Sequence, residues 1–323
     1  MLPQASGPEP VRGSILWTMH RYVPILSAAL AMALATGASA QQRPPIVGVA
    51  HIALKTADLA GAREFYGNYL GYQEAFSISN PDGTPEVTYF KVNDRQYIEV
   101  FPAAPSEAEG QLSHVAFETT NAEQLRVYLA SRGVAVPDAL RTLPDGNLSF
   151  VIKDPEGHSI EFVQYVMTGA LGRTFGKFEP ASRISVHIGH VGFTVKDRDA
   201  EDRLFRDILG FHEVWHGGFK DAGPWDWVAM RVPDGMDHLE YMLNVHDASP
   251  HTLGVMNHVC LIVPSVYASY KTLIERGMKI DQPPKTGRDG KRQLNLYDPN
   301  LTRAELMEPK PVEKPCCSTF LDK

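Results

Sequence analysis

Three features are scarce in this 323-residue chain, and each scarcity excludes a class of protein. Three cysteines are too few for a disulfide framework. Lysine and arginine number 31 against 38 aspartates and glutamates, and they form no basic cluster of the kind that binds nucleic acid. Beyond residue 40 no apolar run is long enough to cross a bilayer. We therefore expect a mature protein that binds neither nucleic acid nor a membrane.

The first 40 residues differ in character from the rest. A basic pair at 20–21 precedes an apolar stretch at 23–35 and the sequence Ala-Ser-Ala at 38–40, which is typical of a signal-peptide cleavage site. Met19 is the better start of such a signal. The apolar stretch is short for a membrane span, although an uncleaved anchor is the alternative. We therefore predict a signal peptide over 1–40 and a secreted or periplasmic mature chain.

Four histidines each open a short apolar strand pattern, and each is followed at a near-constant distance by a glutamate in another such pattern. The separations are 48, 47, 50 and 47 residues. The pairs are His51 with Glu99, His114 with Glu161, His190 with Glu240, and His258 with Glu305. Packing alone does not require a repeat of these two residue types, so the pattern indicates a module that gives one imidazole and one carboxylate to a shared metal site.

The segments between each pair follow one plan. After the histidine strand, a polar residue marks a helix start and a glycine suited to a left-handed conformation marks its end. The helix starts are Asp58, Asn121, Asp199 and Ser265, and the ends are Gly71, Gly133, Gly210 and Gly277. Three short strands follow, of which the last holds the glutamate. The sequence therefore predicts an α+β fold built from four βαβββ modules.

A higher-order repeat divides the chain into two domains. Modules one and three share a Leu-Gly-aromatic sequence at the helix end, and modules two and four share Asp-Pro seven residues before the glutamate. We predict a first domain over 41–166, a linker over 167–186, a second domain over 187–310 and a flexible tail over 311–323. Adjacent modules are expected to pair, with pairing of one with four and two with three as the alternative.

On these residues the chain resembles the vicinal oxygen chelate superfamily, which includes glyoxalase I, extradiol ring-cleaving dioxygenases, fosfomycin-resistance proteins and bleomycin-binding proteins. The resemblance covers about 46–310 and is most specific in DPEGHSIEFVQY (154–165). The segment YDPNLTRAELMEP (297–309) is a looser version. The resemblance implies that two modules pair to curl a sheet around a metal in a cup, with ligands from the first and last strands of each module.

All eight repeated residues are thus candidate metal ligands. Side chains alternate across a strand, so His51 and Glu99 can converge if both face the concave side of a sheet. Imidazole and carboxylate suit Fe, Mn, Ni, Co or Zn, and the spacing does not choose among these divalent ions. A ligating glutamate that loosens can serve as a proton-transfer base, which makes Glu161, Glu240 and Glu305 candidate catalytic residues. A single such residue in a strand is more often a half-exposed polar position; the fourfold repeat favours the metal site.

Three functions remain open for a small-molecule substrate. A glyoxalase-like lyase or isomerase would use two histidines and two glutamates to move a proton through a metal-bound enediolate. An extradiol dioxygenase would use Fe(II) with His190, His258 and Glu305 in the second domain, leaving Glu240 surplus. A non-enzymatic binding or resistance protein would keep an aromatic cleft and lose metal ligands. The chain is expected to be a monomer or a homodimer.

Further histidines and aromatic residues gather in the second half of the sequence. They are His212, His216, His238, His246, His251, Trp215, Trp225, Trp227 and Tyr241. One interpretation is strand surface with aromatic core. The other is an acid/base histidine and an aromatic wall beside the second site. The first is preferred for any single residue, because none lies in a recognisable motif.

Overall fold

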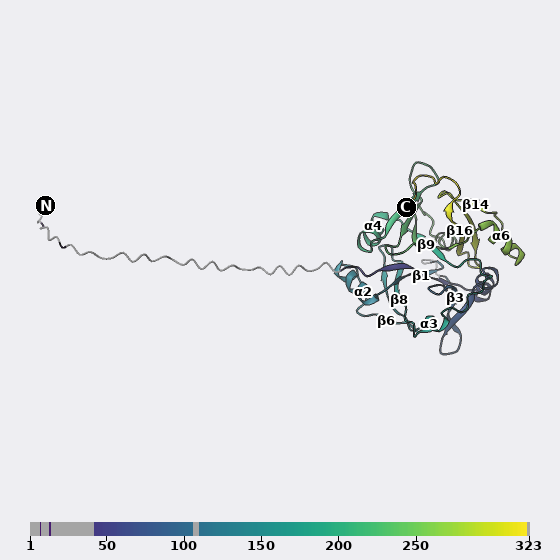
Figure 1. The fold of residues 1–323 in the computed structure, drawn as a ribbon, viewed down its shortest axis with the longest axis horizontal. Helices are drawn as coiled ribbons and strands as arrows, with labels where there is room; N and C mark the ends of the chain where they lie inside the picture. Colours follow the sequence, from purple (N-terminus) through teal and green to yellow (C-terminus); the bar gives the residue numbers. More distant parts are fainter. Residues whose placement is uncertain (1–6, 8–12, 14–41, 106–109, 322–323) are drawn as a thin grey trace. The chain divides into compact units, whose positions relative to one another are not determined.

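The computed structural model describes Gly7, Gly13, 42–105 and 110–321. Apart from those two glycines, the predicted signal peptide lies outside the described residues. Residues Gln41–Lys323 form one compact unit that contains both predicted domains (Figure 1).

Two eight-stranded mixed sheets make up this unit. The first has the order β2-β3-β4-β1-β5-β8-β7-β6 and the second the order β10-β11-β12-β9-β13-β16-β15-β14. The strands of the first are β1 (Ile46–Lys55), β2 (Gln73–Ser79), β3 (Pro85–Asn93), β4 (Gln96–Phe101), β5 (Leu112–Thr119), β6 (Arg141–Thr142), β7 (Leu148–Lys153) and β8 (Ser159–Gln164). Those of the second are β9 (Ile188–Thr194), β10 (His212–Gly217), β11 (Trp227–Arg231), β12 (His238–Met242), β13 (His258–Ile262), β14 (Lys285–Thr286), β15 (Lys291–Tyr297) and β16 (Arg303–Pro311).

Each sheet joins two modules through an antiparallel pair of first strands. β1 pairs with β5, and β9 pairs with β13. The last strand of each module runs parallel to its own first strand, as β4 does beside β1. The four ligand-bearing strands of a domain therefore lie side by side at the centre of its sheet. The predicted fold of four βαβββ modules is confirmed, and adjacent modules form the pairs.

Each module contains the predicted helical segment. These segments are α1 (Leu59–Ala62) with η1 (Arg63–Tyr69), α2 (Ala122–Ser131), α4 (Arg198–Asp202) with η2 (Arg203–Ile208), and α6 (Val266–Glu275). In modules one and three the second half widens into π-helical turns. The four terminal glycines have φ between +80° and +87°. In the third module Asp197 caps the helix by accepting from the N–H of Ala200, so the predicted cap at Asp199 is wrong by one half-turn.

The two domains share one apolar core. Phe117 of β5 and Phe211, which follows η2, lie with ring centroids 5.2 Å apart. β1 and β9 meet near the centre of Figure 1. There Gln96 donates to the carbonyl of Ile188 at 3.0 Å and accepts from its N–H at 2.8 Å. Buried apolar area and paired polar groups thus fix the two sheets against each other.

The shared Asp-Pro turns form two equivalent contacts between the domains. In the first domain's turn, Glu156 accepts hydrogen bonds from the backbone N–H groups of Lys196 and Asp197, just before α4. In the second domain's turn, Asn300 accepts from the N–H of Ala57, just before α1. Each turn therefore satisfies free donors at the helix start of the opposite domain. This contact gives the sequence repeat a structural reason.

The composition of the C-terminal segment suggested a flexible tail. In the structure, the described residues of this segment pack on the second sheet. The N–H of Leu321 donates to the carbonyl of Val214 in β10, and the Trp215 indole donates to the carbonyl of Cys316 at 3.2 Å. The ring of Phe320 stacks on Trp215. Cys316 and Cys317 are disulfide-bonded to each other in this segment. The exposed edge of β10 supplies partners that sequence composition does not reveal.

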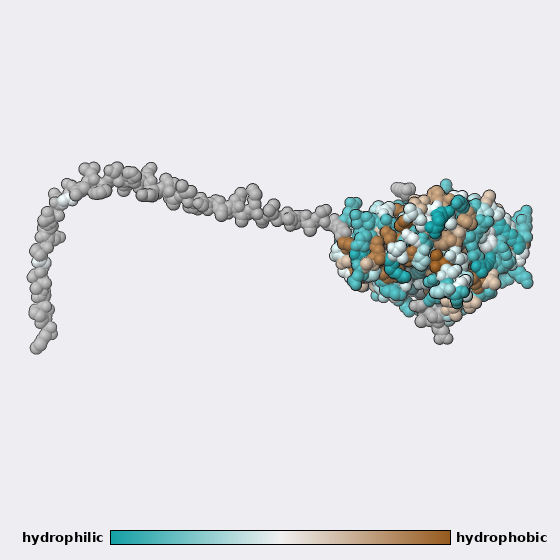
Figure 2. Space-filling view, turned by 90° about the horizontal axis from the view of Figure 1, so that it is seen from below, coloured by the Kyte–Doolittle hydropathy of each residue, from teal (hydrophilic) through white to brown (hydrophobic). Residues whose placement is uncertain are grey.

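The surface shows scattered apolar side chains among polar ones, as Figure 2 illustrates for one face. The most exposed large examples are Phe219 (76% exposed) and Met236 (68%). Among the described residues, no helix has the length and apolarity needed to traverse a bilayer. Monomer or homodimer remains a prediction.

Candidate metal centres

The first domain brings its four repeated residues into one cluster. The Nε2 atom of His51 lies 3.0 Å from that of His114 and 3.1 Å from Oε2 of Glu161. His114 Nε2 also lies 3.0 Å from Glu161 Oε2. Glu99 stands slightly apart, with Oε1 3.4 Å from His51 Nδ1 and Oε2 3.9 Å from His114 Nε2. The compact set is two imidazoles and one carboxylate, with a second carboxylate in reach.

The second domain repeats this arrangement. The Nε2 atoms of His190 and His258 are 3.1 Å apart. Glu305 Oε2 lies 3.4 Å from His190 Nε2, and Glu240 Oε2 lies 3.3 Å from His258 Nε2. His258 is held by a second contact, because its Nδ1 lies 2.8 Å from the carbonyl oxygen of Met256. Such a contact leaves Nε2 free to face a metal ion.

The donor spacing fits a transition-metal ion in both clusters. Ligand atoms at about 2.1 Å from one ion lie about 3.0–3.4 Å from each other in octahedral or tetrahedral geometry. The nitrogen–nitrogen separations of 3.0 and 3.1 Å fall in that range. Among the eight candidate ligands, two groups of three have all their ligand atoms within 4.8 Å of one another: His51, His114 and Glu161, and His190, His258 and Glu305. The chain thus has the donor set for a divalent metal ion in each domain.

The comparison with known families agrees with this arrangement. The family model of the Glyoxalase/Bleomycin resistance protein/Dioxygenase superfamily matches residues 48–162 and 187–306, more than half of the chain. The chain belongs to this superfamily. The resemblance inferred from the repeated histidines and glutamates is therefore confirmed, and every candidate ligand lies inside a matched segment.

Solved structures show the same two-domain superfamily fold. The 2,3-dioxygenase LapB from Pseudomonas sp. KL28 matches with a TM-score of 0.64 and 15% identity, covering 85% of this chain and 97% of that one. The Mn(II)-bound glyoxalase from Novosphingobium aromaticivorans matches with a TM-score of 0.63 and 17% identity, covering 87% of each chain. The Brevibacterium fuscum homoprotocatechuate 2,3-dioxygenase, in complex with 3,4-dihydroxyphenylacetate, matches with a TM-score of 0.62 and 16% identity. The match covers 87% of this chain and 86% of that one. At these identities the likeness establishes the fold.

Among curated proteins, the uncharacterized protein YwbC of Bacillus subtilis (strain 168) is 28% identical over 125 residues. The match covers 35% of this chain and 94% of YwbC. It therefore has the extent of one superfamily domain, consistent with duplication of a two-module unit in this chain.

Electrostatics differ between the two centres. In the first, burial lowers the pKa of His51, which favours the neutral imidazole that binds metals. Burial opposes ionisation of Glu161, but hydrogen bonds with His114 and His51 outweigh it and hold the Glu161 pKa well below its usual value. Burial and the charge of Glu161 raise the pKa of Glu99 well above its usual value. Before an ion binds, Glu99 therefore favours its protonated form.

In the second centre, both carboxylates favour the ionised form. Burial opposes this, but the hydrogen bond with His190 and the charge of Arg303 lower the pKa of Glu305 to about 2. The hydrogen bond with His258 lowers the pKa of Glu240. His258 itself is fully buried against Gly192, where an added Cβ would lie 2.2 Å from the imidazole Cε1. The second centre therefore presents more negative charge to an incoming cation.

The cups around the centres differ in the space they leave. Beside His51 and Glu99 the free cavity is only about 10 Å³, roughly the room for one water. Leu171 of α3 (Ala170–Thr174), in the predicted linker, is 1% exposed and packs there against Tyr89 and Tyr97. The second cup opens into a cavity of about 390 Å³ that Glu240 and Glu305 border. Among the residues that the structure describes, the 390 Å³ cavity has room for a small molecule, whereas the 10 Å³ space beside His51 and Glu99 does not.

The structure separates the additional histidines and aromatic residues of the second half. Trp215 and Trp227 line the large cavity, which supports the aromatic-wall interpretation for these two. His238 lies beside His190 in the register of β12 and β9, and burial lowers its pKa to about 3. His246 and His251 are exposed. None of the five additional histidines lines the large cavity.

Sequence reasoning missed polar residues close to the centres. Asp145 and Asp289 are not among the candidate residues chosen from the sequence, yet each borders the cup of its domain. Burial raises the pKa of Asp145, and it raises that of Asp289 to about 6. Arg303 also lines the large cavity. Its spacing two residues before Glu305, on the same strand face, was the available signal.

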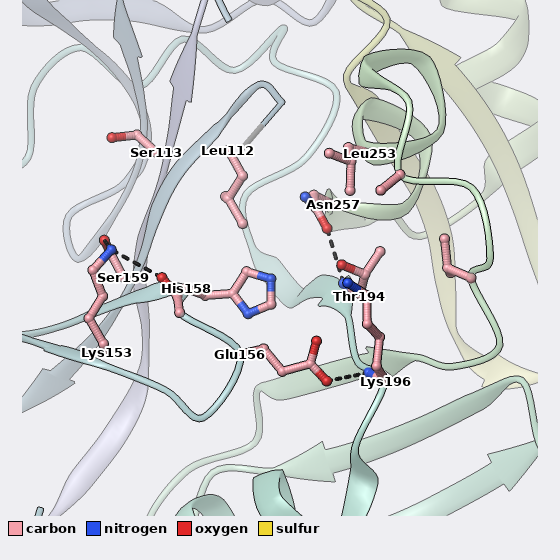
Figure 3. A pocket seen from close by; sticks show the side chains of 13 residues that line it. Leu112, Ser113, Lys153, Glu156, His158, Ser159, Thr194, Lys196, Leu253 and Asn257 are labelled. Carbon is pink, nitrogen blue, oxygen red and sulfur yellow. Dashed lines mark hydrogen bonds between the residues drawn. The ribbon is translucent and has the colours of Figure 1, made fainter. Parts of the chain in front are cut away.

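A separate pocket of about 160 Å³ lies between the domains. Figure 3 shows His158 and Glu156 of the first domain facing Thr194 and Lys196 of the second. None of the eight candidate ligands lines it. One of its polar residues, Glu156, forms the turn-to-helix contact described above, because it accepts from the backbone before α4.

Proposed function

We propose that the chain is a metal-dependent enzyme that acts in its second domain on a small substrate with vicinal oxygens, by glyoxalase-like proton transfer. The observation that carries this is the position of Glu240. Its carboxylate lies within 3.3 Å of His258 Nε2 and also borders the 390 Å³ cavity. It can therefore reach both an ion and a substrate.

The chain's own residues suit this chemistry. A divalent ion held by His190, Glu240, His258 and Glu305 would supply a Lewis acid that polarises the substrate oxygens. Burial opposes ionisation of Glu240, but the hydrogen bond with His258 and the charges of His190 and His258 together lower its pKa, which favours the ionised carboxylate. Its Oε2 can accept a proton from a substrate carbon and return it to the neighbouring atom.

Extradiol ring cleavage is the second candidate. A specific observation favours it: His190, His258 and Glu305 form the compact donor set, and Glu240 is not part of that set. Two histidines and one carboxylate leave open positions for a catechol and O₂. In this case Glu240 would be dispensable.

The test compares isosteric variants of the metal-loaded protein. Glu240→Gln and Glu305→Gln are assayed on α-keto aldehyde adducts and on catechols, with and without O₂. Proton transfer predicts that both variants lose about 100-fold or more in turnover and that the wild type works without O₂. Glu99→Gln, in the closed first cup, is the matched control and should retain turnover.

Two outcomes would change this assignment. Stoichiometric O₂ uptake with a nearly unaffected Glu240→Gln variant would replace proton transfer by ring cleavage. Absence of turnover in the protein loaded with each of Fe, Mn, Ni, Co and Zn would favour a binding protein.

We also propose export of the mature chain, on the basis of the basic start, apolar stretch and Ala-Ser-Ala sequence within residues 1–40. Mass spectrometry of native material should show a terminus near Gln41. An intact Met1 or Met19 terminus in a cytoplasmic fraction would overturn this.

A further inference from the structure

The large cavity of the second domain contains polar atoms that lack partners. Nε and Nη2 of Arg303 are buried and have no hydrogen-bond partner among the described residues. Oδ1 of Asn295 is likewise buried and unpaired there. Both residues line the cavity. Buried donors and acceptors are normally paired, so these atoms mark positions where a ligand would complete the bonding.

The strand register places these atoms beside the metal ligands. Asn295 of β15 is the Cα partner of Glu305 in β16. Arg303 precedes Glu305 by two residues, which puts both on one strand face about 6.6 Å apart. The Arg303 charge is close enough to contribute to the lowered pKa of Glu305. A molecule that reaches the metal-ligand cluster would therefore also reach the guanidinium.

The first domain does not repeat this feature. The residues at the equivalent register positions are Val151, the partner of Glu161, and Ser159, two residues before it. The branched apolar side chain of Val151 and the hydroxyl of Ser159 need no charged partner. The guanidinium is thus confined to the domain that has an open cavity, which links it to ligand binding and not to the shared fold.

Among the described residues that line the cavity, Arg303 is the buried cation with unpaired donors. Arg288 is engaged, because it donates to Asp221, to Cys316 Sγ and to the carbonyl of Gly218. Lys285 lies on β14 at the exposed rim. Asp289 accepts from the N–H of Lys291, and the two glutamates belong to the metal centre. A planar guanidinium matches a carboxylate through two parallel hydrogen bonds.

We propose that this cavity binds a substrate that has a carboxylate on an aromatic or otherwise apolar body, and that Arg303 binds the carboxylate. The vicinal oxygens of the substrate would then face the metal centre, a placement that rests on the proposed function. Trp215, Trp227 and Met242 supply the apolar surface. Asn295 Oδ1 accepts a hydrogen bond from a substrate hydroxyl.

The test measures binding and not turnover. Quenching of tryptophan fluorescence in the metal-loaded protein without O₂ compares 3,4-dihydroxyphenylacetate with methylcatechol, which has a methyl group in place of the acidic arm. The wild type should bind the carboxylate about tenfold or more tightly. Arg303→Gln should abolish this preference, so that the two ligands bind with about equal affinity. Lys271→Gln, a charge change on a side chain that is 80% exposed, is the control.

Equal affinity of the two ligands in the wild type, a preference that survives in Arg303→Gln, or no binding of either ligand would overturn the proposal. If Arg303→Gln does not fold, Arg303→Lys should weaken carboxylate binding several-fold, because it keeps the charge but loses the paired donors. Carboxylate preference in a protein without turnover would count against the proposed reaction and leave this inference standing.

Discussion

Substituting Leu171 by alanine should open the first metal centre. The side chain is 1% exposed and belongs to the cluster of Ala75, Val87, Tyr89 and Tyr97 beside His51. Removing a buried leucine side chain lowers the free energy of unfolding by about 2–5 kcal/mol, because transfer energy is lost and a cavity remains. Part of that cavity would join the 10 Å³ space next to the ligands. Water and chelator should then reach an ion that the wild type encloses.

Two measurements check this prediction. Denaturant unfolding gives the stability change, and the rate of metal release to a coloured chelator shows access to each centre. Two release phases are expected in the wild type, and Leu171→Ala should accelerate the slower one. Leu125→Ala, a fully buried leucine of α2 away from both centres, should lower stability similarly without changing release. Unchanged release in Leu171→Ala would refute the idea that this side chain closes the cup.

Burial and the charges of Asp154 and Glu156 raise the pKa of Glu201 to about 9, so the folded chain keeps a proton that the unfolded chain loses near pH 4.3. The unfolding free energy of the wild type should thus fall, relative to that of Glu201→Gln, by up to about 1.4 kcal/mol per pH unit between these two pKa values. Denaturant unfolding of both proteins across this pH range measures the difference, and an equal pH dependence of the two would contradict the prediction. Glu156→Ala should lose about 1–2 kcal/mol of unfolding free energy, since two backbone donors before α4 lose their acceptor, whereas the exposed control Glu123→Ala should lose under about 1 kcal/mol. Removal of the metal by a chelator should lower the melting temperature of the metal-loaded wild type. A drop of similar size in the double variant His114→Ala, His258→Ala would show that the stabilising metal ion is not bound at these centres.

The sequence by itself determined the modules and the residues that meet in them. Strand alternation, capping residues and glycines act over a few positions, so their repetition was visible without tertiary information. Because each histidine and glutamate keeps its place within a repeated module, pairing of modules was sufficient to bring them together. The contact that the Asp-Pro turns make between the domains was also indicated in the sequence, by the motif that modules two and four share. The third helix cap was misplaced, since Asp197 and Asp199 are both good capping residues and only backbone geometry distinguishes them.

Tertiary structure alone decided how the two centres differ. Leu171 fills the first cup because a short linker helix folds back over it, whereas the corresponding segment of the second domain runs on to β10 and leaves a cavity. The partnerless guanidinium of Arg303 is likewise a property of everything that surrounds it. Such differences depend on contacts between segments far apart in the chain, and local periodicity in the sequence does not predict those contacts. The sequence therefore indicated candidate ligands in both domains without choosing between the two centres, and long-range packing left a substrate-sized cavity beside the second one.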